Sequence, residues 1–593
     1  MKERNEKRPA RKKGIVPIAV LLTIGLVVNI ACGIFYSAIT PFMTANLNPL
    51  LTGQKQVTTG QSLTVEQAAE QSRAMAQELV QEGAVLLKDQ NNALPLAEGT
   101  AVNLFGYGSV DPIYGGSGSG ASDTSSNIDL VTGLTNAGFT VNQELVDFYK
   151  KSGVSRAAQK GFEGSNFTPA EVPAAQYTDT LLQNAKAFSD VAIVTFSRVG
   201  GEGGDLPQDM YAAGYSKTDD GRHYLELTQD EEDLLALIKA QGFGKVIVLI
   251  NSSNAMELGF LEDDSIDAAL WIGSLGSTGF NAVGEILSGN VNPSGRLSDT
   301  YAYDLTTAPA YWNAGDFTYS NLNHHYVEYA EGIYVGYRYY DKAGVPVRWP
   351  FGFGLSYTEF AYSDLTVEDD TVTVAVRNIG KCSGAEVVQL YLAAPQEGLH
   401  RPVRELKGFQ KVHLQPGESE TVRFSLTDRS FAVWQEGWKV PAGTYTVCIG
   451  GLTAEIKKSG DDLSIPAWQN GSWYAHCTGK PDPADWEKML GHSYTPPVLK
   501  KGSFTMDNTV MEMKDYSLMM KIMFKAVEST VAKGFGGKKD YENPDFRMMM
   551  NASAGAPLRS MQISGGMKGG VLPGMLEMAN GHFFRGIWKM IKG

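Results

Sequence analysis

Three ionisable side chains lie close together in a glycine-rich stretch, and their types and spacing make them the strongest candidates for chemistry. The stretch runs from Ser197 to Pro207 and holds Arg198, Glu202 and Asp205 among four glycines. It follows residues 191–196, a short apolar run rich in β-branched residues that predicts a buried strand. Open α/β sheets bind ligands at the carboxyl ends of their strands, so charges here predict a binding or catalytic site. The alternative is a polar surface turn, because glycine-rich loops after strands are common.

Composition and charge narrow the class of protein. A length of 593 residues predicts three or four domains rather than one core. The net charge of −14 argues against a nucleic-acid-binding protein, which needs basic surfaces for phosphates. The four cysteines are scattered, so no zinc site or disulfide framework is predicted, although Cys382 and Cys448 fall in one β-rich region. We expect no metal site and no cofactor.

The N-terminus predicts a membrane anchor. Residues 2–13 carry seven Lys or Arg, and residues 14–39 carry no charge and are long enough to cross a bilayer as a helix. A basic flank stays in the cytoplasm, so we expect a single-pass cell-membrane protein whose domains from residue 41 onward are extracytoplasmic. A cleaved signal peptide is the alternative, but the apolar run is long and no clean A-x-A site follows. Lipid attachment at Cys32 is weaker, because the apolar run continues past it.

The central part of the chain predicts two domains. In residues 63–358 short apolar strands alternate with helical patterns, which is typical of an α/β sandwich with a mostly parallel sheet covered on both faces. Its clearest helical pattern spans residues 226–240, where Thr228 is expected to cap the helix and to form a capping box with Glu231. In residues 359–460 short alternating strands separated by turns predict an all-β sandwich.

The remaining regions are assigned from composition. Residues 1–40 form the basic tail and transmembrane helix, and residues 41–62 form a polar linker. Residues 461–593 form an extension rich in methionine and glycine, and fourteen of the twenty methionines fall at or after Met506. Methionine fills irregular gaps, so we expect a loosely packed helical appendage docked on the sandwich or on the membrane face.

Several stretches between residues 70 and 460 together resemble glycoside hydrolase family 3. In chain order they are residues 83–88 with 94–96, Gly-Glu-Gly at 201–203 with Asp205, residues 290–297 with Thr300, residues 334–341 and residues 350–358. The resemblance covers the family's α/β-sandwich domain and the fibronectin-III-like domain that follows it. It implies a sugar-active protein, since family members hydrolyse terminal β-linked sugars, most often β-glucosides, with retention.

The resemblance also implies roles for individual residues. A retaining glycosidase needs two carboxyl groups about 5–5.5 Å apart, one as nucleophile and one as general acid/base. In the family the acid/base is a Glu on a loop of the sandwich domain, and Glu202 matches it. Arg198 and Asp205 are candidates for orienting Glu202 or binding sugar hydroxyls. Ser117 and Ser119 stand in a second glycine-rich loop that borders the sugar site in the family, and they are further candidates for substrate binding.

The sequence departs from the family where the nucleophile is concerned. In family members the nucleophile is an Asp on a preceding (β/α)8 barrel, which needs roughly 250 residues. Only 133 residues follow the predicted β-sandwich, without a repeated strand–helix pattern, and 62 precede the α/β domain. We therefore assign no nucleophile to this sequence.

Two functions of different classes fit these expectations. The first is an anchored glycosidase of the β-glucosidase type, with Glu202 as acid/base and a barrel-domain protein as the partner that supplies the nucleophile. The second is a non-catalytic, membrane-anchored carbohydrate-binding or assembly module, whose sugar binding would be indifferent to Glu202→Gln. An incomplete gene product is a third alternative.

Overall fold

The computed structural model describes most of the chain after residue 62. The described residues are 63–116, 124–156, 169–200, 206–211, 215–313, 317–318, 325–326, 329–395, 401–434, 436–461, 463, 472–477, 479–493, 498–541, 544–560 and 569–592. They divide into two compact units, one from the described parts of residues 64–318 and 324–495 and the other from those of residues 496–593. The predicted anchor at residues 14–39 lies outside the described residues. Among the residues that the structure describes, no helix combines the length and the apolar character that a membrane crossing needs.

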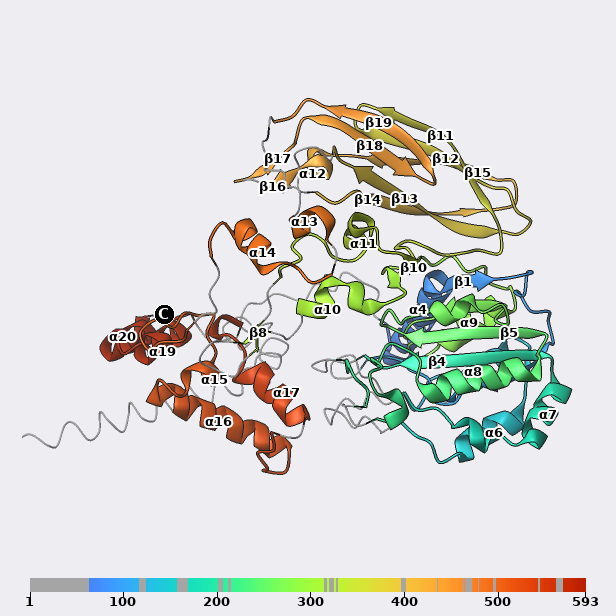
Figure 1. Ribbon diagram of the computed structural model, residues 1–593, viewed down its shortest axis with the longest axis horizontal. Helices are drawn as coiled ribbons and strands as arrows, with labels where there is room; N and C mark the ends of the chain where they lie inside the picture. The colour runs from blue at the N-terminus through green and yellow to red at the C-terminus, as the bar shows by residue number, and fades with distance from the viewer. Residues whose placement is uncertain are drawn as a thin grey trace, which may run out of the picture. The chain divides into compact units, whose positions relative to one another are not determined.

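A six-stranded sheet forms the centre of the first domain (Figure 1). Its strands lie in the order β1-β6-β5-β4-β2-β3. Their bounds are β1 (Val85–Asp89), β2 (Ala101–Phe105), β3 (Thr140–Val141), β4 (Val191–Arg198), β5 (Lys245–Ser252) and β6 (Ala268–Trp271). Neighbouring strands are parallel except for β1 and β6, which are antiparallel. The predicted mostly parallel sheet is confirmed, and the carboxyl ends of β2, β4, β5 and β6 meet at one edge.

Helices cover both faces of this sheet. Their bounds are α4 (Val65–Gly83), α5 (Leu130–Asn136), α6 (Gln143–Lys151), α7 (Asp179–Phe188), α8 (Gln229–Gln241) and α9 (Gly279–Leu287). One apolar core joins α4, α5 and α9 to the sheet through side chains such as Leu134 and Phe280. A second core joins α6, α7 and α8 to the opposite face, for example through Leu182 and Leu234. Figure 1 draws α4 and α9 above the sheet and α6, α7 and α8 below it.

Local sequence determines where α8 begins and ends. The Thr228 hydroxyl accepts a hydrogen bond from the Glu231 N–H, and the Glu231 carboxylate accepts one from the Thr228 N–H. This is the predicted capping box, and it satisfies backbone donors that a helix N-terminus leaves free. The helix ends at Gly242, which adopts the left-handed conformation with φ of +62°. The box holds the buried Glu231 carboxylate in the first turn.

An antiparallel β-sandwich follows, as predicted. One sheet has the order β11-β12-β15 and the other β14-β13-β18-β19. The bounds are β11 (Phe360–Glu368), β12 (Thr371–Asn378), β13 (Gly384–Ala393), β14 (Glu405–Leu414), β15 (Ser419–Ser425), β18 (Gly443–Ile449) and β19 (Leu452–Lys458), with the hairpin β16 (Val433–Trp434) and β17 (Trp438–Lys439) and the short α12 (Asp428–Phe431) beside them. Alternate side chains of both sheets form one apolar core. Cys382 and Cys448 are both free thiols.

Shorter elements join the two domains. They are β7 (Tyr301–Ala302), α10 (Pro309–Asn313), β8 (Phe317–Thr318), β9 (His325–Tyr326), α11 (Tyr337–Ala343) and β10 (Val347–Trp349). Arg296, which follows α9, forms an ion pair with Glu386 of β13. The Glu386 carboxylate also accepts a hydrogen bond of 2.7 Å from the Tyr362 hydroxyl. Polar contacts of this kind fix the sandwich against the α/β domain.

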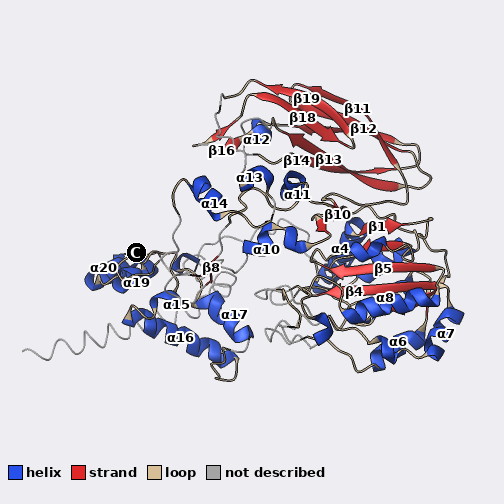
Figure 2. Cartoon of the chain, in the orientation of Figure 1, coloured by secondary structure: helices blue, strands red, loops and turns tan. Residues whose placement is uncertain are grey.

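The C-terminal part is helical among the described residues (Figure 2). The helices α13 (Trp473–His476) and α14 (Pro483–Leu490) belong to the first unit, and the second unit contains α15 (Val510–Met513), α16 (Leu518–Gly534), α17 (Pro544–Ser553), α19 (Val571–Ala579) and α20 (Phe583–Lys592). Met513, Met520 and Met550 are buried in the core of this second unit. The methionine-rich tail therefore has an apolar core of its own.

Candidate active site

The last two residues of β4 lie at the carboxyl edge of the sheet. Ser197 and Arg198 are in register with the end of β5, and both side chains are buried. The loop singled out by the sequence continues directly from them. Its residues 201–205, including Glu202 and Asp205, lie outside the described residues, so their roles stay predictions. The described residues on either side show how the loop is held.

The Arg198 guanidinium is fully buried and donates five hydrogen bonds within the protein. Two go to the Glu231 carboxylate, over 2.7 Å from Nη1 and 2.6 Å from Nη2. The other three go to the carbonyl oxygens of Tyr224, Glu226 and Ser197. Burial opposes the charge, but the interactions with Glu231 outweigh it and raise the pKa of Arg198, so the guanidinium stays charged. Arg198 thus joins β4 to the start of α8, and its part in substrate binding stays a prediction.

A single tyrosine holds both ends of the loop that contains Glu202. Before the loop, the Val199 N–H donates to the Tyr224 hydroxyl oxygen over 2.9 Å. After it, the Tyr224 N–H donates to the Pro207 carbonyl oxygen over 3.0 Å. The Tyr224 ring also packs with Val199 and Met210 in a small buried cluster. The two ends of the loop are therefore fixed to one residue at the carboxyl edge of the sheet.

The described start of the second glycine-rich stretch lies beside the described start of the first, at Gly116 and Gly200. It follows β2, and its last described residue before Ser117 and Ser119 is Gly116. A Cβ atom on Gly116 would lie 3.5 Å from the Gly200 carbonyl oxygen, which is van der Waals contact. Ser117 and Ser119 lie outside the described residues, and their roles stay predictions. The structure does bring together the described flanks of the two loops that the sequence marked.

Asn251 of β5 binds the end of β4 and the segments that follow β2 and β6. Its Oδ1 accepts hydrogen bonds from the Ile113 N–H over 2.6 Å and from the Ser197 hydroxyl over 3.0 Å. Its Nδ2 donates to the carbonyl oxygens of Ile113 and Gly273 over 2.9 and 2.7 Å. The side chain is fully buried, and every position of its amide is used. No local sequence pattern marks this role, since Ile113 lies 138 residues away.

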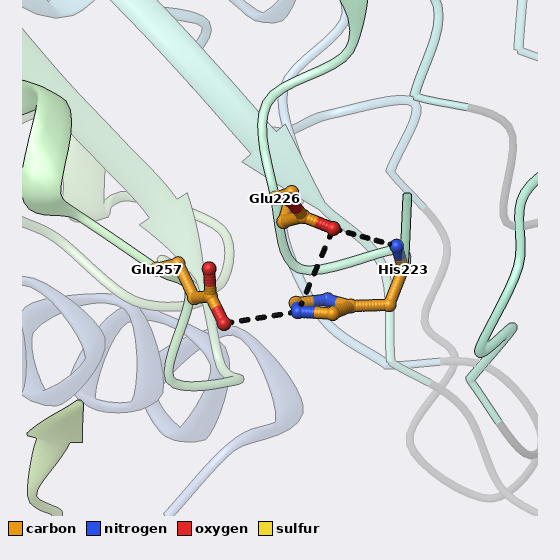
Figure 3. Close-up of side chains that lie close together, drawn as sticks. All are labelled: His223, Glu226 and Glu257. Carbon is orange, nitrogen blue, oxygen red and sulfur yellow. Dashed lines mark hydrogen bonds and ion pairs between the residues drawn. The ribbon is translucent and has the colours of Figure 1, made fainter. Parts of the chain in front are cut away.

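His223, Glu226 and Glu257 form the group of described side chains whose donor atoms lie within 4.8 Å of one another (Figure 3). The His223 Nδ1 accepts from the Leu225 N–H, which puts the ring proton on Nε2, and Nε2 donates to Glu257 over 3.0 Å. The Glu257 oxygen also accepts from the Leu305 N–H over 2.6 Å. With Nε2 acting as a donor, the cluster forms a hydrogen-bonded brace between loops.

A buried carboxyl group lies under the start of the loop after β2. Glu171 accepts hydrogen bonds from the N–H groups of Tyr107 and Val172, over 2.9 and 2.8 Å. Burial raises the pKa of Glu171 to about 8, so the group is protonated at neutral pH. The neighbouring Gly106 N–H donates to the Tyr149 hydroxyl over 2.6 Å. Like Asn251, Glu171 positions the loop backbone and carries no signal in the local sequence.

The first unit thus contains an α/β domain followed by a β-sandwich. The loops marked by the sequence follow the carboxyl ends of parallel strands, where open α/β sheets bind ligands. Residues 84–337 match the family described as the Glycosyl hydrolase family 3 C-terminal domain. Residues 386–453 match the family described as the Fibronectin type III-like domain. The chain therefore carries the C-terminal domain of glycosyl hydrolase family 3 followed by a fibronectin type III-like domain, which confirms the resemblance found in the sequence.

Similar proteins are β-glucosidases. A "Beta-glucosidase" of Ruminococcus albus is 34% identical over 402 residues, which cover 65% of this chain and 40% of that protein. "Thermostable beta-glucosidase B" of Acetivibrio thermocellus is 31% identical over 396 residues, covering 64% and 47%. The structure of β-glucosidase 3B from Thermotoga neapolitana in complex with α-D-glucose is similar with a TM-score of 0.58 at 33% identity, covering 66% of this chain and 54% of that one. The chain thus spans between two fifths and a half of the length of the two curated relatives.

Proposed function

We propose that this chain supplies the acid/base half of an active site that hydrolyses terminal β-linked glucosides with retention. Glu202 protonates the leaving oxygen in the first step and removes a proton from water in the second. The nucleophilic carboxylate comes from a (β/α)8 barrel on another chain, and forms and then releases a covalent glycosyl intermediate. The substrate class rests on the β-glucosidase names of the relatives.

The observation that carries the proposal is the attachment of the Glu202 loop to Tyr224 at both ends. An acid/base must stay within hydrogen-bonding reach of one oxygen atom, so its loop needs a fixed base. The buried ion pair of Arg198 and Glu231 joins the end of β4, where the loop begins, to the start of α8. The glycines around Glu202 allow a sugar to approach the loop backbone closely.

The test compares the wild-type chain with Glu202→Gln on aryl β-glucosides. Each is assayed alone and mixed with candidate barrel proteins encoded in the same genome. In an active mixture, we expect Glu202→Gln to lower turnover about 10²–10⁴-fold for a phenyl glucoside. The loss of kcat/KM, which reports the first step alone, should be much smaller for a dinitrophenyl glucoside, because a good leaving group needs little protonation. This contrast identifies an acid rather than a residue that only maintains the fold.

The matched control is Glu98→Gln, which changes an exposed carboxylate and should leave turnover unchanged. Absence of activity in every mixture, or an active mixture in which Glu202→Gln has no effect, would contradict the proposal. Saturable sugar binding that Glu202→Gln does not alter would support the alternative, a non-catalytic carbohydrate-binding or assembly module. Calorimetric titration with glucose and short β-glucans measures that binding.

We also propose that residues 14–39 anchor the chain as a single membrane-spanning helix and leave the domains from residue 41 onward outside the cytoplasm. The support is the sequence alone: an uncharged apolar run of membrane length after seven basic residues. Protease added to intact cells should then digest the β-sandwich. Resistance in intact cells with digestion in lysed cells would contradict this orientation.

A further inference from the structure

The last helix of the chain turns its apolar side to solvent. In α20 the five apolar side chains most exposed are Phe583, Phe584, Ile587, Trp588 and Ile591. They recur at intervals of one, three and four residues and so share one side of the helix. Phe584 is 85% exposed, Ile591 79% and Trp588 58%. Helices of a soluble domain usually bury such a stripe, so its exposure needs an explanation.

The packing of α20 against α19 determines this rotation. The two helices meet at Gly574 and Gly586. A Cβ atom on Gly574 would lie 2.6 Å from the Gly586 carbonyl oxygen, and one on Gly586 would lie 2.5 Å from the Gly574 carbonyl oxygen. No larger residue fits at either position, so the glycine side of α20 is held against α19. The aromatic side cannot turn inward without breaking this contact.

Charge pairing holds the same rotation. Glu577 of α19 forms ion pairs with Arg585 over 3.4 Å and Lys589 over 2.6 Å, both of α20, and its carboxylate is hydrogen-bonded over 3.0 Å to Nδ1 of His582 in the turn before that helix. The hydrogen bond from Lys589, with that from His582, outweighs burial and lowers the pKa of Glu577. The basic side of α20 therefore also faces α19 and leaves the apolar side outward.

The unit that carries α20 is basic although the chain is acidic. Residues 496–593 contain fourteen Lys or Arg against eight Asp or Glu, in a chain of net charge −14. Lys592 continues the basic flank beside the apolar stripe, and its Nζ lies 4.4 Å from the centroid of the Trp588 ring. An exposed stripe of Phe, Trp and Ile with Lys and Arg beside it is typical of helices that lie in a membrane interface.

We propose that α20 docks on the surface of a lipid bilayer that contains anionic headgroups. The apolar stripe enters the boundary between headgroups and acyl chains, and Lys592 beside it binds a lipid phosphate. A second copy of this chain fits the stripe less well, because pairing two such helices would bring Arg585 and Lys592 of each toward like charges. A bilayer of this kind satisfies the apolar and the charged parts of the surface together.

Tryptophan emission tests the proposal on the full chain. The chain has nine tryptophans and none in residues 1–62, so the predicted anchor adds no signal. The protein is reconstituted in vesicles of brominated phosphatidylcholine with about one quarter phosphatidylglycerol. We expect the bromine atoms to quench part of the emission and Trp588→Phe to remove that quenching. The matched control is Trp434→Phe. Trp434 of β16 is also exposed, at 66%, and its removal should leave the amount of quenched emission unchanged.

The lipid charge gives a second, independent readout. Lys592→Gln should lower the ratio of docked to undocked helix about fivefold, the usual effect of one charge near an anionic surface. Vesicles of phosphatidylcholine alone should lower it further. Equal quenching of the wild type and Trp588→Phe, or quenching that ignores phosphatidylglycerol, overturns the proposal. So does a chain that remains unquenched and sediments as a dimer that Phe584→Ser dissociates, because the stripe is then a contact between copies.

Discussion

Replacing Arg198 by methionine tests whether a buried ion pair holds the base of the Glu202 loop. Methionine keeps much of the apolar volume and removes all five hydrogen bonds that the guanidinium donates. The Glu231 carboxylate would remain buried, with the N–H and hydroxyl of Thr228 as its remaining donors among the hydrogen bonds described here. Removing one partner of a buried pair costs about 3–5 kcal/mol. We expect Arg198→Met to lower the free energy of local unfolding by that amount.

Two further variants test whether the loss expected for Arg198→Met comes from the unpaired buried charge. The double variant Arg198→Met/Glu231→Met should lose less than the sum of the two single variants, because each single variant leaves one buried charge unpaired and the double variant leaves none. The matched control is Lys239→Met, which breaks an ion pair between Lys239, in the same helix as Glu231, and Asp263 at 2.6 Å that is open to solvent. An exposed pair of this kind contributes about 0–1 kcal/mol, so the control variant should hardly change the free energy of local unfolding.

Hydrogen exchange of the β4 amides measures local unfolding free energy without assuming that the whole chain unfolds in one step. Arg198→Met should accelerate exchange in β4 and at the start of α8 and leave the β-sandwich unchanged. Unchanged exchange in β4, combined with a raised KM in an active mixture, would refute the structural reasoning. That result would show that Arg198 acts on the substrate, as the sequence analysis considered.

Two other changes test the support of the neighbouring loop. The folded pKa of Glu171, about 8, lies above its ordinary value of 4.5, so the unfolded chain releases this proton first. The free energy of unfolding should therefore fall as pH rises from about 4.5 to about 8, by at most about 1.4 kcal/mol per pH unit from this group. Urea titrations should show that the difference between wild type and Glu171→Gln follows this slope; a difference constant with pH would contradict it. Asn251→Asp removes the two N–H donors to Ile113 and Gly273 and should cost about 2–4 kcal/mol in the same titrations, while an unaltered midpoint would show that these bonds contribute nothing net.

Local patterns in the sequence predicted the strand β4 and the start of the helix α8. They did not predict the contacts between residues that are far apart in the sequence. The run at 191–196 predicted β4, and the spacing of Thr228 and Glu231 predicted a capping box that the structure contains. Glu231 has a second role, as partner of Arg198 thirty-three residues away, and no periodicity encodes it. The same holds for the two bonds by which Tyr224 fixes the loop ends, since they depend on how β4 and the turn before α8 meet in three dimensions.

The second unit shows why composition alone misjudges a helical tail. Its methionines suggested loose packing, yet α19 and α20 approach until only glycine fits at Gly574 and Gly586. A helix with an apolar and a basic side would ordinarily be expected to bury the apolar one. Here the glycine contact at Gly586 and the ion pairs of Arg585 and Lys589 with Glu577 of α19 select the opposite rotation. The glycine and the two basic residues lie on the sides of α20 away from its aromatic stripe. Exposure of that stripe is therefore a consequence of specific contacts, which favours a dedicated partner surface over incomplete packing.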